Sequence, residues 1–225
     1  MERKNTLKHT TVNKNGRDVV RNVSTFSILL SPFSILLLFA FFFTRCEKDG
    51  GGSSKADWFD GKISAKIENG EDSDISKVWA LFDAKVNSSG DLTGRMIGDG
   101  EFEDGRLEID LPDVPDIYLI NIETFFSSGL ELDYELEFSN PDSRVLNVDF
   151  YGLSSSGKYV DYFVFTNKKA VCLFVYVDSD VTVKGNKNVT VKFKEGWNRI
   201  YWTPASDKVT STAPSGMKWY LNKDL

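Results

Sequence analysis

Residues 100–112 read GEFEDGRLEIDLP, and they give the clearest indication of the fold in this chain. The pair Asp104-Gly105 is typical of a two-residue turn between antiparallel strands, because both residue types tolerate the backbone conformation that such a turn requires. Apolar side chains flank the pair at alternating positions, with Phe102 before it and Leu107, Ile109 and Leu111 after it. Turn chemistry and period agree, so the stretch predicts a β-hairpin whose second strand ends at Pro112.

The stretches upstream of this hairpin carry related patterns. Lys62–Glu68 (KISAKIE) places Ile63, Ala65 and Ile67 on one face and polar residues on the other, as expected of a half-buried strand. Ile75–Val86 (ISKVWALFDAKV) has apolar residues at neighbouring as well as alternate positions. This second stretch is therefore either a strand covered on both faces or a partly helical segment.

The pattern downstream is mixed at first and then becomes clear. Between residues 116 and 138, Tyr118–Ile122 and Leu130–Phe138 are the two possible strands. Three runs of β-branched and aromatic residues follow, at Val145–Leu153, Tyr159–Thr166 and Ala170–Val177. The third run is apolar on both faces, so we expect it in the centre of its sheet, with Cys172 as a buried structural thiol.

The C-terminal part continues the strand pattern. Val189, Val191 and Phe193 alternate with polar residues, Glu195-Gly196 turns the chain into Trp197–Trp202, and PSGMKWYL closes it. Many short strands with few helical windows between them predict an all-β domain. We expect an antiparallel β-sandwich of the immunoglobulin-like kind, with a partly closed β-barrel as the alternative.

An uncharged apolar run, Asn22–Thr44, precedes this domain. Its apolar centre, Phe26–Phe43, has 18 residues, close to the roughly 20 that a membrane-spanning helix needs. Pro32 weakens the first half, whereas Ile35–Phe43 matches the shorter apolar region of a signal peptide. The basic flank at residues 1–21 favours a cytoplasmic N-terminus and export of the residues that follow.

Cys46 comes just after the apolar run and is followed by Glu47, Lys48, Asp49 and a Gly/Ser stretch. This arrangement resembles the signal of a bacterial lipoprotein, in which the cysteine is acylated and becomes the mature N-terminus. The acidic, glycine-rich exit resembles the tether of Bacteroidetes lipoproteins. The resemblance implies lipidation at Cys46 and attachment to a membrane. Arg45 stands where that family has a small residue, so an uncleaved apolar helix at 26–43 that holds the domain at the membrane is the alternative.

The chain thus divides into a basic leader with its apolar segment (1–46), a flexible linker (47–57) and a β domain (58–225). Within the domain, EGWNRIYW and PSGMKWYL, with GEFEDGRLEIDLP upstream, resemble a set of Bacteroidetes lipoproteins that end on similar strings. The resemblance implies a fold and a cell-envelope location, at the outer membrane or the cell surface, and it carries no catalytic residues. An inner-membrane anchor with a periplasmic domain is the alternative location.

The charge is distributed unevenly along the chain. Residues 1–46 hold seven Lys/Arg and two acidic residues, a net charge of +5. The residues after Cys46 hold 20 basic and 31 acidic residues, a net charge of −11. A domain this acidic repels phosphate backbones, so nucleic acid is not an expected partner.

The β domain lacks the residues that several common chemistries need. The one histidine is His9, in the leader, which excludes Ser-His-Asp and Cys-His catalysis and imidazole-based zinc sites in the domain. The acidic cluster at residues 71–74 lacks the spacing of a calcium loop. No glycine-rich phosphate loop indicates a cofactor. A pair of carboxylates would still suffice for a glycoside hydrolase.

Aromatic side chains favour a binding role instead. Trp197 and Trp219 lie beside turns in polar contexts, so they are the candidates for stacking against a sugar ring, although tryptophan in such a fold more often packs in the core. The leading hypothesis is a membrane-anchored, non-enzymatic lipoprotein of the cell envelope with a binding or structural role. A surface glycan-binding lipoprotein of a polysaccharide-uptake system is the alternative, and a carboxylate-based glycoside hydrolase is the second alternative.

Overall fold

The computed structural model describes residues 57–130, 135–185 and 189–225. Cys46, the apolar segment 26–43 and nearly all of the 47–57 linker lie outside these residues. Lipidation, the N-terminal helix and the linker therefore stay predictions. In the described part of the chain, no helix has the length and apolar character that crossing a membrane requires.

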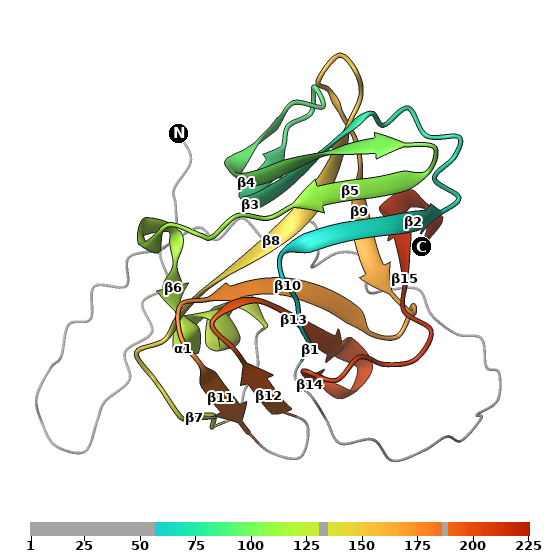
Figure 1. The fold of residues 1–225 in the computed structure, drawn as a ribbon. Helices are drawn as coiled ribbons and strands as arrows, with labels where there is room; N and C mark the ends of the chain where they lie inside the picture. Colours follow the sequence, from blue (N-terminus) through green and yellow to red (C-terminus); the bar gives the residue numbers. More distant parts are fainter. Residues whose placement is uncertain (1–56, 131–134, 186–188) are drawn as a thin grey trace, which may run out of the picture. The chain divides into compact units, whose positions relative to one another are not determined.

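The described residues form an all-β domain, as the sequence predicts (Figure 1). Helical segments are short, and α1 (Ile122–Thr124) continues directly into a π-helical turn at Phe125–Gly129. The strands are β1 (Asp57–Trp58), β2 (Lys62–Glu68), β3 (Lys77–Val86), β4 (Leu92–Glu103), β5 (Arg106–Asp110), β6 (Ile120–Asn121), β7 (Glu137–Phe138), β8 (Arg144–Leu153), β9 (Tyr159–Thr166), β10 (Val171–Val177), β11 (Val181–Lys184), β12 (Val189–Phe193), β13 (Gly196–Thr203), β14 (Lys208–Thr210) and β15 (Lys218–Leu221).

Eight of these strands close into a barrel in the order β8, β3, β4, β5, β2, β15, β9 and β10. β8 closes the ring because its two halves have different partners. Residues 145–148 pair with β10, and residues 150–153 pair with β9. β9 and β10 also pair with each other, at Thr166 and Val171. The pair of β2 with β15 is parallel, whereas the other pairs of the ring are antiparallel.

A second group of strands continues from the barrel through β10. The edge of β10 that faces β13 pairs with it from Val171 to Val177. β14, β12, β11 and β7 then extend the network, in the lower half of Figure 1. β10 thus has neighbours on both edges, which confirms the prediction that the run at 170–177 is central.

The all-β class is confirmed, but the expected immunoglobulin-like sandwich of two separate sheets is not what the chain forms. All strands in the described part of the chain join one hydrogen-bonded network, and the ring of eight is closer to the alternative, a barrel. The physical reason is the length of β8. With 10 residues it reaches both β9 and β10, so the ring has no open edge there.

The two faces of β10 belong to two hydrophobic cores. Cys172 and Phe174 pack in the barrel interior, and Cys172 is buried, as predicted. Val175 and Val177 pack in a second core. This second core includes residues of α1 and the π-helical turn, of β11 to β13 and of β14, namely Ile122, Phe126, Val183, Val191, Ile200 and Val209.

The local predictions agree with the structure where the pattern was strong. β4 and β5 flank Asp104-Gly105, and both turn residues have positive φ, of 49° and 72°, as the predicted turn requires. Ile75–Val86 is a strand from Lys77 onward. The mixed region at 116–138 holds only two-residue strands and short helical turns among its described residues.

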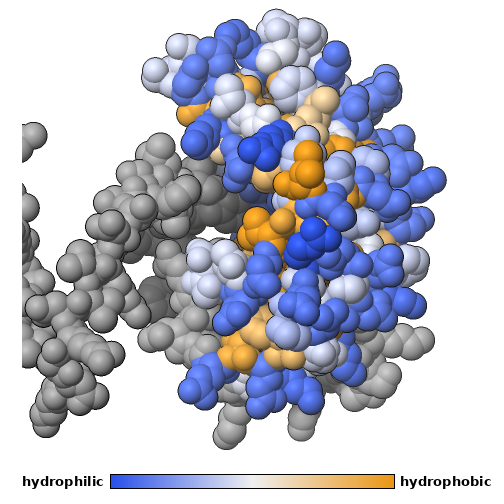
Figure 2. Space-filling model, turned by 90° about the vertical axis from the view of Figure 1, so that its left-hand side faces the viewer, coloured by the Kyte–Doolittle hydropathy of each residue, from blue (hydrophilic) through white to orange (hydrophobic). Residues whose placement is uncertain are grey.

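Figure 2 shows one face of the domain. Where the described residues form this face, hydrophilic side chains predominate and hydrophobic ones occur in small groups between them. Charged residues make up 27% of the chain, and the barrel strands expose their polar positions, as in β5 with its alternation of exposed and buried residues.

Candidate functional site

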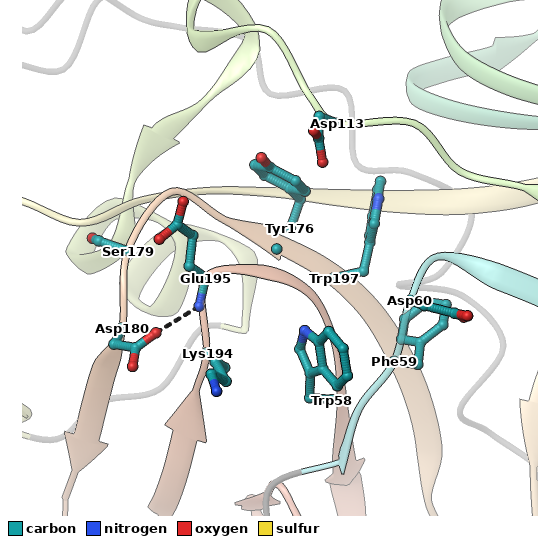
Figure 3. A pocket seen from close by; sticks show the side chains of 11 residues that line it. Trp58, Phe59, Asp60, Asp113, Tyr176, Ser179, Asp180, Lys194, Glu195 and Trp197 are labelled. Carbon is teal, nitrogen blue, oxygen red and sulfur yellow. Dashed lines mark hydrogen bonds between the residues drawn. The ribbon is translucent and has the colours of Figure 1, made fainter.

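A hollow of about 710 Å³ opens beside the start of β13 (Figure 3). Its walls come from β1 and the residues after it, the loop after β5, the turn after β10 and the turn between β12 and β13. Its volume lies in the range of small-ligand sites. The lining residues are Trp58, Phe59, Asp60, Asp113, Tyr176, Ser179, Asp180, Lys194, Glu195, Gly196 and Trp197.

Trp58 forms the open aromatic side of this hollow. β1 pairs with β13 so that Trp58 lies opposite Asn198, and this short pairing holds the indole at the edge of the hollow in Figure 3. Its exposed fraction is 51%, the highest of the five tryptophans. The ring is therefore available to a ligand.

Trp197 lines the same hollow from inside the domain. It is only 3% exposed, and its Nε1 donates a hydrogen bond to the carbonyl oxygen of Pro112 at 2.9 Å. Its ring packs against Phe59 and Tyr176, with centroid separations of 6.4 and 5.4 Å. Trp197 thus ties the loop after β5 to β13 and presents little surface to a ligand.

The turn before Trp197 is fixed by Asn198, which is 1% exposed. Its side-chain oxygen accepts from the N–H of Lys194 at 3.0 Å, and its amide donates to the carbonyl oxygens of Lys194 and Gly196 at 2.7 and 2.8 Å. Gly196 has a φ of +97°, a conformation that favours glycine. The string Gly196-Trp197-Asn198 therefore shapes one wall of the hollow.

The lining of the hollow is acidic. Four carboxylates, those of Asp60, Asp113, Asp180 and Glu195, stand against the single ammonium group of Lys194, a net charge of −3. Asp180 accepts a hydrogen bond from the N–H of Glu195 at 2.8 Å, drawn as a dashed line in Figure 3, and this bond joins the two turns. None of the four carboxylates forms an ion pair with another described residue.

Burial and the negative charge of the lining both affect the pKa of the Tyr176 hydroxyl. Burial, followed by the nearby carboxylates of Asp113 and Glu195, raises the pKa of the Tyr176 hydroxyl above its usual value. The phenol therefore stays neutral at physiological pH. In Figure 3 Tyr176, Asp113 and Glu195 lie on one side of the hollow and Trp58 on the other.

Two carboxylates close to the hollow, unlike those that line it, form ion pairs with Arg144. Burial acts to raise the pKa of Asp178, but hydrogen bonds from Arg144 and Ser179 outweigh it and lower that pKa. Arg144 Nε donates to Asp178 at 2.8 Å, and the same guanidinium pairs with Asp116 at 3.3 Å. Arg144 thus compensates these two carboxylates, whereas those that line the hollow have no such partner among the described residues.

Trp219, the other tryptophan singled out from the sequence, is not among the residues that line this hollow. It is 7% exposed and stacks against Phe165 and Phe174, with centroid separations of 5.2 and 5.4 Å. It borders a smaller cavity of about 140 Å³, which Phe59 and Arg199 also line. Trp197 and Trp219 therefore do not form one site.

The groups in the larger hollow are suited to binding. They offer an open indole, carboxylate acceptors and one ammonium group. Over residues 57–130, 135–185 and 189–225, no three His, Cys, Asp or Glu side chains gather to hold a metal ion.

The sequence analysis did not single out Trp58, because the exposure of its side chain depends on pairing with β13, far along the chain. The available signal was its place in WFDG, directly before the first alternating strand.

Comparison of the chain with protein-family models, with curated proteins and with solved structures gives no match.

Proposed function

We propose that the chain is a membrane-anchored, non-enzymatic lipoprotein of the cell envelope, and that its β domain binds glycans at the hollow beside β13. The observation that most directly supports glycan binding is the half-exposed indole of Trp58 at the edge of a hollow lined with carboxylates. The apolar C–H face of a sugar ring packs against an indole, and carboxylates accept hydrogen bonds from sugar hydroxyls.

The fixed walls of the hollow favour a binding role over a purely structural one. Asn198 holds the turn at 194–196 with three hydrogen bonds, and Trp197 holds the loop after β5. A site that is ordered before the ligand arrives loses less conformational entropy on binding. The ordered walls therefore support the proposal that the hollow is a binding site.

The anchoring part of the proposal rests on the sequence before the domain. A basic leader, an apolar run and Cys46 with its acidic exit support acylation at Cys46 and an outer-membrane or cell-surface location. Retention of the 26–43 helix, with the domain in the periplasm, is the alternative. In either arrangement the domain faces extracytoplasmic polysaccharide.

A glycan array tests the binding part. The full chain is applied in a polyoxyethylene detergent, whose headgroup is neither a sugar nor charged. The array compares the wild type with Trp58→Ala and with Met96→Ala, a control of similar exposure at 54% on β4. We expect hits that Trp58→Ala loses and Met96→Ala retains. An array without hits, or hits that persist in Trp58→Ala, would refute glycan binding at this hollow. Cleavage of a bound oligosaccharide would favour the carboxylate-based hydrolase.

Metabolic labelling with a clickable fatty acid tests the anchoring part. The matched variants are Cys46→Ala and Cys172→Ala, which remove the two cysteines of the chain in turn. We expect Cys46→Ala to lose the label and Cys172→Ala to keep it, because Cys172 is buried in the barrel. Unchanged labelling of Cys46→Ala would show that lipidation at this residue is wrong.

A further inference from the structure

We infer that the glycan bound in the hollow is cationic, an oligosaccharide that carries free amino groups, such as one built from glucosamine. This inference rests on the proposed glycan binding and specifies the chemical class of its ligand.

The first observation is the uncompensated charge of the lining. The hollow has a net charge of −3. Among the described residues, the carboxylates of Asp113 and Glu195 have neither an ion-pair nor a hydrogen-bond partner. Carboxylates in a concave surface reinforce one another, since the protein around them screens their charge less than water does. The hollow therefore attracts cations and repels glycans that carry uronate or sulfate groups.

The second observation is the contrast between the lining and the carboxylates that lie next to it in the sequence. Arg144 pairs with Asp178 at 2.8 Å and with Asp116 at 3.3 Å. No described cation pairs with the four carboxylates of the lining, although Lys194 is present in it. A positively charged ligand supplies a partner there.

The third observation is the position of the aromatic rings. The negative face of an indole attracts a cation as well as an apolar C–H surface. Trp58, half exposed, lies on one side of the hollow, and Asp113 and Glu195 lie with Tyr176 on the other (Figure 3). An amino sugar meets both requirements, because one ring carries the C–H face and the ammonium group. A neutral sugar packs against the indole but supplies no positive charge to pair with the carboxylates.

The test compares two tetrasaccharides of equal length, one of glucosamine and one of N-acetylglucosamine, by isothermal titration calorimetry. The full chain is kept in the polyoxyethylene detergent, at a pH at which the amines are protonated. We expect the glucosamine tetramer to bind about tenfold more tightly at low salt, which corresponds to two carboxylate–ammonium contacts at partly exposed positions. The preference should shrink as salt rises, because salt screens exposed charges.

Charge variants supply the matched controls. Glu195→Gln and Asp113→Asn should each weaken glucosamine binding by roughly fivefold. Lys194→Gln should strengthen it, an opposite effect that general damage to the fold does not produce. Glu103→Gln, at the hairpin at the other end of β5 from Asp113, should leave affinity unchanged. Thermal melting curves confirm that each variant is folded.

The possible results distinguish a cationic ligand from glycan binding in general. Equal affinity for the two tetramers would overturn the cationic ligand and leave glycan binding standing. Failure of both tetramers and of every array glycan to bind would overturn both. Binding of a trilysine peptide as tightly as the glucosamine tetramer would assign the hollow to cationic peptides, and would also overturn both.

Discussion

Trp197 and Trp58 line the same hollow, yet alanine at the two positions is expected to have different effects. Trp197→Ala should mainly lower the free energy of unfolding, whereas Trp58→Ala should mainly remove glycan binding. The reason is their exposure, 3% for Trp197 and 51% for Trp58. A ring that is already packed stabilises the domain, and a ring that is open is available to a ligand.

The magnitude for Trp197 follows from its buried area and its hydrogen bond. A buried tryptophan removes roughly 200 Å² from water, which corresponds to about 5 kcal/mol as an upper limit. The bond from Nε1 to Pro112 contributes about 1 kcal/mol. Large-to-small changes in cores usually cost about 3–5 kcal/mol. We therefore expect a loss of about 4 kcal/mol for Trp197→Ala. Trp197→Phe, which keeps a ring but removes the donor, should lose about 1–2 kcal/mol.

Trp58→Ala is the comparison. About half of this side chain is in water already, so the loss should be about 2 kcal/mol or less. Urea unfolding followed by circular dichroism measures both variants in the full chain, and the glycan array measures binding. A change below about 1 kcal/mol in Trp197→Ala, together with complete loss of binding, would refute the reasoning, since Trp197 would then be a ligand contact and not a core residue.

Other predictions concern pH, the bend at Gly61 and the turn at Asn198. Burial, opposed by a hydrogen bond from Asn147, raises the pKa of Asp149 from 3.8 to about 6. The folded chain therefore holds this proton more tightly than the unfolded chain, and a stabilisation of up to about 3 kcal/mol is present below pH 4 and lost as pH rises through 6. Urea titrations from pH 4 to 8 should show this loss in the wild type and in the exposed control Asp72→Asn but not in Asp149→Asn, and identical pH profiles would contradict it. Gly61 has a φ of +85°, and a Cβ there would lie 2.6 Å from the carbonyl oxygen of Leu111 and 3.2 Å from Cδ1 of Trp197. Gly61→Ala should therefore lower the unfolding free energy by about 2 kcal/mol, and unchanged urea curves would show that the bend adapts. Asn198→Ala leaves the Lys194 N–H and two carbonyl oxygens without their partner, so we expect a loss of about 2 kcal/mol and weaker glycan binding by calorimetry; wild-type affinity would mean that the turn does not shape the site.

The parts of the fold that depend on local pattern were predictable from the sequence. Lys62–Glu68 alternates strictly and is β2, and the turn at Asp104-Gly105 joins β4 to β5. Closure of the barrel was not predictable in this way. It depends on β8 pairing with both β9 and β10 and on β15 lying parallel to β2. These contacts join distant parts of the chain, and the period of a single strand does not specify its partner.

The candidate site was predictable only in part, for a related reason. A polar neighbourhood in sequence placed Trp197 beside a turn, and it does line the hollow. Its ring is nevertheless packed, because Pro112, Phe59 and Tyr176 reach it from other elements. For Trp58 the local signal was its place in WFDG, directly before the first alternating strand, and this place does not by itself indicate exposure. Its role follows only once β1 pairs with β13.

The most direct test of the account follows the indole N–H signals of the five tryptophans in a two-dimensional ¹⁵N NMR spectrum. The labelled full chain in detergent is titrated with the tightest-binding oligosaccharide, and the Trp58 signal is assigned by its absence in Trp58→Ala. The account predicts that the Trp58 signal moves with ligand occupancy, that the Trp197 signal moves less, and that the Trp219 signal stays fixed. A Trp58 signal that does not move at saturation, while that of Trp219 or Trp202 does, would place the ligand elsewhere and contradict the account.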